Sequence, residues 1–260
     1  MITQLQFNNK SLIREYKSKS QIVRILSEDW VEKNVYCPYC LNKNLRKFEN
    51  NHKSGDFICE DCGNIFELKS SKNKFSKKVI DGEYFTMINS IESNNTPNFY
   101  LLNYDEDFFV KNLIIIPKLF VSKSIIEKRK PLSENAKRAG WIGCNILLDN
   151  VPFDGKIKLI DDERVINPKK IKKQIRKFSF LQKYPSDLRG WTLDVWKCLE
   201  NLSKEEFSLK EIYGYEIALK KLHKNNNYVK PKIRQQLQIL RDFNLIKFLG
   251  KGKYRILDFH

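Results

Sequence analysis

Two groups of residues between Val35 and Lys69 have the types and spacing of metal-binding sites. The first is a pair of Cys-x-x-Cys motifs with eighteen residues between them, formed by Cys37, Cys40, Cys59 and Cys62. This spacing is typical of a structural zinc site, and four thiolates complete a tetrahedral shell that leaves no open position for chemistry. The sequence therefore predicts a bound Zn²⁺ that stabilises the fold. His52 is an alternative ligand, although four cysteines already suffice.

The second group is interleaved with the second cysteine pair and consists of Asp56, Glu67 and Lys69. Two carboxylates can hold Mg²⁺ while it retains water ligands, and the backbone carbonyl of Leu68 would add a further ligand. Such a metal ion polarises a phosphate and lowers the pKa of a bound water, which Lys69 would orient or activate. The trio predicts metal-dependent phosphodiester hydrolysis. Glu-x-Lys alone is also common on a solvated strand face. The catalytic interpretation therefore depends on Asp56 at the opposed position and on a DNA-binding region elsewhere in the chain.

A β-hairpin would bring these three side chains together. Phe57–Cys59 and Asn64–Lys69 have the pattern of two short strands around a tight Cys-Gly turn. If Cys59 faces Asn64 across the hairpin, then Asp56 faces Glu67. Glu67 and Lys69 share a face because side chains alternate along a strand, and Leu68 then points into the core.

The first 184 residues mix expected helices and strands, which indicates an α/β or α+β domain. Apolar residues at helical spacing predict a helix over Ser18–Lys33, and a short helix is expected over Asp81–Asn89. Apolar runs of strand length predict four strands, at Asn98–Tyr104, Asn112–Pro117, Ile142–Leu148 and Lys156–Ile160. Lysines dominate two segments without acids, Lys69–Lys78 and Pro168–Lys177. The first is expected to be a phosphate-contacting loop, and the second either a linker or a phosphate-contacting helix.

A composition shift near Tyr184 marks a second domain over residues 185–260. Three helices are expected, over Trp191–Leu202, Leu209–His223 and Val229–Phe243, the second with a capping box formed by Ser208 and Glu211. A basic hairpin follows, with its turn at Gly250–Gly252. Three helices and a basic hairpin predict a winged helix.

In a winged helix the third helix enters the major groove of DNA. Arginine pairs with guanine and glutamine with adenine, which makes Arg234, Gln235 and Gln238 candidates for reading bases. Lys232 lies beside them, and Lys251 and Lys253 would contact phosphate from the wing. The alternative is a solvated polar face. From His223 to Arg255 there are nine Lys or Arg and one acid, which favours DNA.

The whole chain of 260 residues has 48 Lys and Arg against 31 Asp and Glu, a net charge of +17. Such an excess favours a polyanionic partner through phosphate neutralisation. No long apolar run or basic amphipathic anchor predicts a membrane association. The N-terminal residues lack a signal core, and the cysteine usage fits a reducing compartment, so we expect a cytoplasmic protein.

With these residues identified, the chain resembles the DpnI-like methyl-directed (type IIM) restriction endonucleases of the PD-(D/E)xK superfamily along nearly its whole length. The matching segments include ILSEDWV, YCPYC, RAGWIGCNI, RGWT, KIRQQLQILRD and GKGKYR. The resemblance implies a nuclease domain with an embedded four-cysteine zinc site, followed by a winged helix. It also implies Mg²⁺-dependent cleavage of double-stranded DNA at GATC with N6-methylated adenine, by Asp56, Glu67 and Lys69. The usual proline before the first aspartate is replaced by Gly55.

Reading a methyl group requires more than one contact, because burying one methyl contributes only about 0.8 kcal/mol. Trp141, flanked by Arg138, is a candidate apolar wall for a methyl, and a core tryptophan is the alternative interpretation. We expect a prokaryotic monomer without an obligate protein partner. The competing hypotheses are a non-catalytic zinc and winged-helix DNA-binding regulator, and a nuclease indifferent to methylation.

Overall fold

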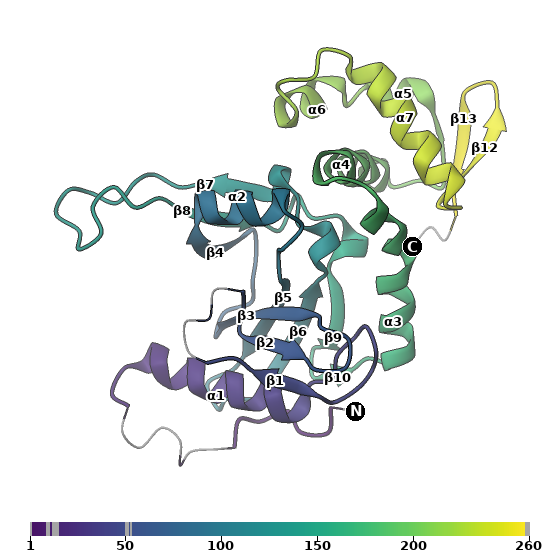
Figure 1. Cartoon of the computed structure of the whole chain (residues 1–260). Helices are drawn as coiled ribbons and strands as arrows, with labels where there is room; N and C mark the ends of the chain where they lie inside the picture. The colour runs from purple at the N-terminus through teal and green to yellow at the C-terminus, as the bar shows by residue number, and fades with distance from the viewer. Residues whose placement is uncertain (1, 9–10, 12–15, 50–51, 53, 258–260) are drawn as a thin grey trace.

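The computed structural model describes residues 2–8, 11, 16–49, 52 and 54–257. Figure 1 shows a large sheet in the lower part of the molecule, a small sheet with a helix above it, and a cluster of helices with a hairpin at the top. The N-terminal half of the chain supplies most of the large sheet, and the yellow C-terminal residues form the hairpin.

The large sheet has the strand order β1-β2-β3-β5-β6-β9-β10. Only β3 and β5 pair in parallel, and the other neighbours are antiparallel. All four strands predicted from apolar runs are present, three of them here and one in the small sheet. The strands of the large sheet are β1 (Leu45–Lys47), β2 (Phe57–Cys59), β3 (Ile65–Ser71), β5 (Asn98–Tyr104), β6 (Val110–Ile116), β9 (Ile157–Asp161) and β10 (Arg164–Val165).

Alternation along β5 sends side chains into two separate cores, because successive residues point to opposite faces of a sheet. Tyr100 and Leu102 pack in the core that includes α1 (Lys19–Asn34) and α3 (Pro168–Lys177). Phe99 and Leu101 pack in the core on the other face. The basic segment 168–177 is thus a helix and not a linker, and its Ile171 and Ile175 anchor it to the sheet.

The small sheet has the order β4-β8-β7 and carries α2. It consists of β4 (Lys78–Glu83), β7 (Ile126–Lys128) and β8 (Gly143–Leu147), with α2 at Tyr84–Glu92. The expected helix over Asp81–Asn89 is wrong at its start, because Asp81 lies in β4 opposite Cys144. Glu83 caps α2 by accepting a hydrogen bond from the backbone N–H of Thr86. Residues 129–142 form a long loop between β7 and β8 that projects from the body (Figure 1).

The C-terminal part has the helices and wing expected from the sequence. They are α4 (Ser186–Asn201), α5 (Leu209–Tyr213), α6 (Glu216–Leu222), α7 (Val229–Asp242), β11 (Glu206–Ser208), β12 (Ile246–Gly250) and β13 (Lys253–Ile256). The capping box of Ser208 and Glu211 is present. The single helix expected over Leu209–His223 is wrong, since it breaks at Gly214–Tyr215 into α5 and α6. An additional strand, β11, joins β13 of the wing.

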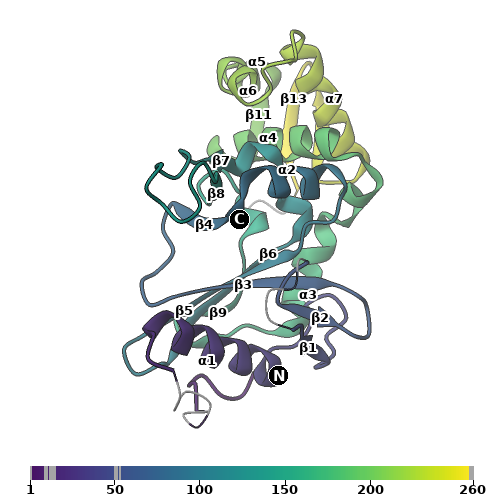
Figure 2. The same ribbon diagram turned by 60° about the vertical axis from the view of Figure 1, so that its left-hand side comes forward.

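One apolar core runs from the small sheet into the C-terminal helices. It contains Ile146 and Phe120 together with Trp196 and Leu237. Polar contacts cross the same seam, since Ser124 Oγ donates to Asp194 Oδ1 at 2.7 Å and Trp196 Nε1 donates to an Asp154 carboxylate oxygen at 3.0 Å. Figures 1 and 2 both show the small sheet and α2 between the large sheet and the C-terminal helices. No helix in the part of the chain that the structure describes has both the length and the apolar character needed to span a membrane.

Candidate active site

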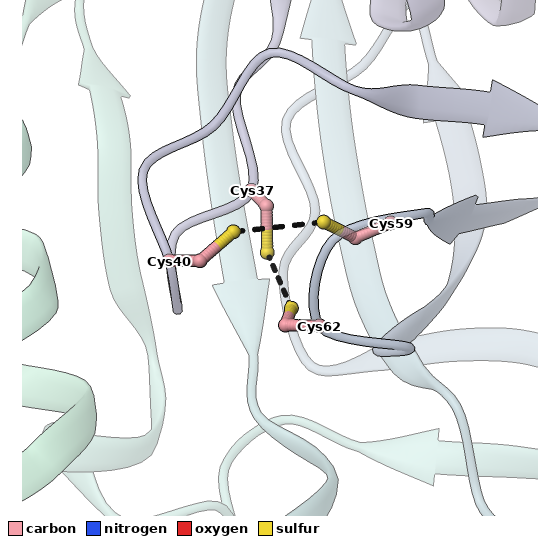
Figure 3. Close-up of side chains that lie close together, drawn as sticks. All are labelled: Cys37, Cys40, Cys59 and Cys62. Carbon is pink, nitrogen blue, oxygen red and sulfur yellow. Dashed lines mark hydrogen bonds between the residues drawn. The ribbon is translucent and has the colours of Figure 1, made fainter.

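The four cysteines of the two Cys-x-x-Cys motifs meet in one cluster (Figure 3). Their sulfur atoms all lie within 4.8 Å of one another, with Cys37 Sγ 3.5 Å from Cys62 Sγ and Cys40 Sγ 3.6 Å from Cys59 Sγ. Four sulfurs bonded to one Zn²⁺ at about 2.3 Å in a tetrahedron would be about 3.8 Å apart. The cluster therefore fits a zinc ion. It is the only group of three or more His, Cys, Asp or Glu ligand atoms with metal-site spacing among the described residues.

Local backbone geometry places the cysteines. The N–H of Cys37 donates to the Asn42 carbonyl at 2.8 Å, and the N–H of Cys59 donates to the Asn64 carbonyl at 2.9 Å. Burial raises the pKa of the Cys59 thiol to about 11. Burial also opposes ionisation of Cys62, but hydrogen bonds from Asn64 outweigh it and lower the pKa of Cys62. Cys62 is also the exposed member of the cluster.

His52 takes no part in the cluster. Its ring stacks on Phe48 with the centroids 3.9 Å apart, and its Nδ1 accepts a hydrogen bond from the backbone N–H of Ser54. The described structure thus gives the imidazole a role in the loop before Asp56 and none among the zinc ligands.

Two pairs of the register predicted for the hairpin are confirmed, since Phe57 pairs with Phe66 and Ile58 with Ile65, and the N–H of Cys59 donates to the Asn64 carbonyl. At the other end the N–H of Asp56 donates to the Phe66 carbonyl at 2.9 Å, so the direct pairing of Asp56 with Glu67 stays a prediction. Asp56 Oδ2 accepts a hydrogen bond from the Leu68 N–H at 2.7 Å, which fixes the aspartate against β3. Leu68 packs against the core on the α1 side, as expected, so Glu67 and Lys69 point to the opposite side.

Gly55 stands directly before Asp56, where the resemblance leads us to expect proline, and its backbone conformation excludes proline. Its φ angle is +145°, a conformation closed to proline and rare for any L-residue. A Cβ atom there would lie 2.9 Å from the backbone oxygen of Phe66. Glycine therefore lets the chain enter β2 close to β3, which brings Asp56 beside the Glu67 strand.

Glu67 and Lys69 form an ion pair, with Lys69 Nζ 2.5 Å from Glu67 Oε1. Burial raises the pKa of Glu67 to about 7, with Asp81 and Asp56 adding to the increase and Lys69 opposing it. Burial also tends to lower the pKa of Lys69, but the carboxylates of Glu67 and Asp81 outweigh it and raise that pKa. The site thus holds a protonated lysine, Lys69, beside a carboxyl group, that of Glu67, which ionises near neutral pH.

Asp81 is a further acidic residue at this site that the sequence analysis did not identify. Its Oδ1 lies 2.6 Å from Lys69 Nζ, and its side chain is 3% exposed. The expected helix over Asp81–Asn89 hid it, because that assignment made Asp81 the first residue of a surface helix. The sequence gives no strand signal here, because Val79 and Ile80 are both apolar. The alternation of the buried Val79 and Asp81 with the exposed Ile80 and Gly82 is visible only in the structure.

The candidate DNA-contacting residues of the winged helix are distributed over α7 and the wing. Ile233, Leu237 and Leu240 bury one face of α7, which leaves Arg234, Gln235 and Gln238 exposed on the other. Lys232 is half-buried at the start of the helix. Arg234 donates to the hydroxyl of Tyr213 on α5 at 2.7 Å.

Lys251 and Lys253 lie at the tip of the wing and are exposed. The turn places three consecutive residues, Gly250 to Gly252, at positive φ, which turns the backbone sharply between β12 and β13. Neither lysine has an ion-pair partner among the described residues, so both ammonium groups are available for phosphate.

Trp141 and Arg138 belong to residues 129–142, between β7 and β8. The loop that these residues form projects away from α7 in Figure 1. The Arg138 guanidinium lies over the Trp141 ring, 4.5 Å from its centroid. Trp141 is half-buried and rests on Gly143, where a Cβ would lie 2.8 Å from the ring. Trp141 is therefore a partly exposed ring on a projecting loop and not a core residue.

Residues 3–184 match the DpnI model, which is described as the Dam-replacing family. This match covers well over half of the chain. The chain belongs to the Dam-replacing family. Residues 187–256 match a second model of the same family, described as the Dam-replacing HTH domain. The two matches support a methylation-dependent restriction enzyme with a C-terminal DNA-binding domain.

The Dam-replacing family matches include every candidate site residue. Asp56, Glu67, Lys69, the cysteine cluster and the loop with Trp141 fall within residues 3–184, and α7 and the wing fall within residues 187–256. The division at residues 184 and 185 separates two matched regions whose apolar core is continuous in the structure. We therefore keep 1–184 and 185–260 as proposed domains that pack firmly together.

Proposed function

We propose that this member of the Dam-replacing family is a type II restriction endonuclease that hydrolyses both strands of DNA at GATC sites with N6-methylated adenine. The observation that supports the proposal is the clustering of charged groups on β3, where the Leu68 N–H holds the Asp56 carboxylate at 2.7 Å and Glu67 pairs with Lys69 at 2.5 Å. A non-catalytic DNA-binding regulator would have no use for this partly buried set of charges.

Carboxylate oxygens and backbone carbonyls are the ligands that Mg²⁺ prefers, and Asp56, Glu67 and the Leu68 carbonyl offer that donor set. When bound, Mg²⁺ supplies a Lewis acid for the scissile phosphate and an acidified water. The chain's own contribution is positional. Asp56 is fixed by the Leu68 N–H, and Lys69 holds a positive charge where the phosphate gains negative charge during hydrolysis.

Two surfaces support sequence recognition. Gln235 and Gln238 present amides suited to adenine, Arg234 presents a guanidinium suited to guanine, and Lys232, Lys251 and Lys253 would bind the backbone. The loop with Trp141 and Arg138 offers an apolar ring beside a cation. Because one methyl contributes only about 0.8 kcal/mol when buried, we propose that strong discrimination combines both surfaces and both methyls of the palindrome.

Each chain has one such set of catalytic side chains. We propose that it acts as a monomer in the cytoplasm of a prokaryotic cell and cuts the two strands in turn, without an obligate protein partner.

Digestion of one plasmid in three forms tests the proposal: GATC-methylated, hemimethylated and unmethylated, each with Mg²⁺ and with EDTA. We expect Mg²⁺-dependent cutting of the fully methylated form and no cutting of the unmethylated form. Equal cutting of all three forms would retain a nuclease and reject methyl recognition. A gel shift without any cutting, unchanged in Asp56→Ala, would indicate a DNA-binding regulator.

A further inference from the structure

The Lys69 ammonium lies between two carboxylates that come from different sheets. Glu67 is its neighbour on β3, at 2.5 Å, and Asp81 reaches it from β4 of the small sheet, at 2.6 Å. Each contact is a charge-assisted hydrogen bond, the strong kind in a partly dry site. The position of Lys69 Nζ is therefore set by the separation of two sheets and not by β3 alone.

The buried carboxylate of Asp81 lowers the stability of the fold in two ways. The Asp81 side chain is 3% exposed, and its second oxygen, Oδ2, is buried without a hydrogen-bond partner among the described residues. An unsatisfied buried oxygen destabilises a fold, and a carboxylate near Glu67 adds like-charge repulsion. Packing alone would be served as well by an uncharged side chain of the same size. Residues that lower stability in this way are typical of functional sites.

The two carboxylates should differ in how they hold Lys69 once a metal ion binds at the site. Glu67 is a proposed metal ligand, and a carboxylate that turns to a divalent ion weakens its hold on Lys69. Asp81 is buried in the small sheet, paired opposite Cys144 of β8, and it keeps Oδ1 directed at Lys69. Asp81 is thus the anion that can retain the lysine when Glu67 is engaged.

We propose that Asp81 is a positioning residue of the reaction, which holds Lys69 Nζ in place for the phosphate and its attacking water. The proposal rests on the proposed nuclease function and adds to it a residue from outside the hairpin. Asp81 itself touches neither phosphate nor metal ion. Its contribution is to the geometry of Lys69.

Asp81→Asn, Asp81→Ala and the control Asp161→Asn test this role. Asp161 also pairs with a lysine, Lys158 at 2.8 Å, but on the surface and at the end of β9. For Asp81→Ala we expect single-turnover cleavage of a methylated GATC duplex to fall about 100-fold, the effect of misplacing a catalytic group by about 1 Å. Asp81→Asn retains an acceptor oxygen and should recover part of the rate. Asp161→Asn should match the wild type.

Three further measurements separate positioning from other roles. Affinity for the methylated duplex without divalent ions, and the Mg²⁺ concentration for half-maximal rate, should both stay within about twofold of the wild type, and both Asp81 variants should remain folded by circular dichroism. Cleavage by Asp81→Ala within threefold of the wild type would overturn the proposal. So would a tenfold rise in the Mg²⁺ requirement, because that would make Asp81 a metal ligand.

A crystal structure of metal-free Asp81→Ala gives a readout independent of activity. We expect Lys69 Nζ to leave the position between the two sheets, and an unmoved Lys69 would overturn the proposal. If the wild type failed to cleave any DNA, the proposed function would fail, while the displaced or unmoved lysine would still decide whether Asp81 positions it.

Discussion

Two sites of different character meet at the hairpin of β2 and β3, one of them completed by Cys37 and Cys40 from the segment before β1. The cysteine cluster is built from four like groups that become compatible when one ion binds them, and its ligands all lie next to tight turns of the same 26-residue segment, Cys37–Cys62. The trio of Asp56, Glu67 and Lys69 is a partly open set of unlike charges, and its lysine also depends on Asp81 from another sheet. We propose that the first arrangement stabilises the fold when it binds a metal ion, and that the second holds unlike charges in place for catalysis.

The largest effect should follow from removing one ligand of the four-cysteine cluster. Cys37→Ser removes a fully buried zinc ligand, and structural zinc binding in small domains contributes about 10–16 kcal/mol. We expect loss of zinc and unfolding of at least the β1–β3 region, measured by metal analysis and circular dichroism. Cys198→Ala, which removes a buried thiol of α4 outside the cluster, is the control and should retain its zinc. A folded, zinc-free Cys37→Ser protein would show that the cluster is not a structural site.

A substitution in the trio of Asp56, Glu67 and Lys69 should lower the rate of cleavage and leave the protein folded. Lys69→Met keeps much of the apolar stem and removes the cation that we propose offsets charge on the phosphate. We expect at least a 10³-fold loss of cleavage, about 4 kcal/mol of transition-state stabilisation, with zinc content and DNA affinity retained. Single-turnover kinetics and gel shifts measure the two effects. If the variant cleaved methylated DNA at the normal rate, Lys69 would be an ordinary strand residue.

The raised pKa of Glu67 should make Mg²⁺ binding at the proposed catalytic site depend on pH. Because the folded state raises this pKa from 4.5 to about 7, the group's contribution to stability is complete below pH 4.5 and is lost as the pH rises through 7. Mg²⁺ needs the ionised form, so its affinity should weaken up to about tenfold per pH unit below 7 and level off above it.

The increase in Tm caused by Mg²⁺ should accordingly be larger at pH 8 than at pH 6. Glu67→Gln should remove this pH dependence. Glu163→Gln, at an exposed glutamate between β9 and β10, should keep it. A Mg²⁺ effect that stayed constant from pH 6 to pH 8 in the wild type would contradict the role given to Glu67.

The smallest effects should come from the DNA-contacting surfaces, where each residue supplies one contact. Gln235→Ala should weaken binding to the methylated site by about 1–3 kcal/mol and relax the choice of base at one position. Lys251→Ala should weaken binding to all sequences alike and lower the salt slope of log K by about 1. Lys19→Ala on α1, at the opposite end of the molecule in Figure 1, is the control. Unequal losses across sequences for Lys251→Ala would make that lysine a base reader.

The difference between the two sites also explains what could be predicted from the sequence. The two Cys-x-x-Cys motifs are recognisable from their spacing, and the pairing of β2 with β3 depends on a turn and on alternation within one hairpin, so local patterns are sufficient for both. Asp81 joins Lys69 through the pairing of β4 with β8, more than sixty residues further along the chain. The segment at Asp81 has a plausible local structure as a helix start, and only the tertiary pairing makes it a strand.

The same limit applies in the winged helix. The buried face of α7 was readable from the spacing of Ile233, Leu237 and Leu240. The break between α5 and α6 was not, because the residues on either side continue a helical pattern through Gly214. Likewise β11 exists because it pairs with β13 from the end of the chain, which no local pattern reveals.

Cleavage and zinc content measured in the same samples test the central claim most directly. Methylated and unmethylated GATC duplexes are incubated with the protein in EDTA for a short time, the bound zinc is quantified, and Mg²⁺ is then added in excess. We predict that zinc stays bound, that nothing is cut in EDTA, and that added Mg²⁺ starts cleavage of the methylated duplex alone. Cleavage that proceeds in EDTA, or that needs added Zn²⁺ and not Mg²⁺, would contradict a closed structural site beside an open catalytic one.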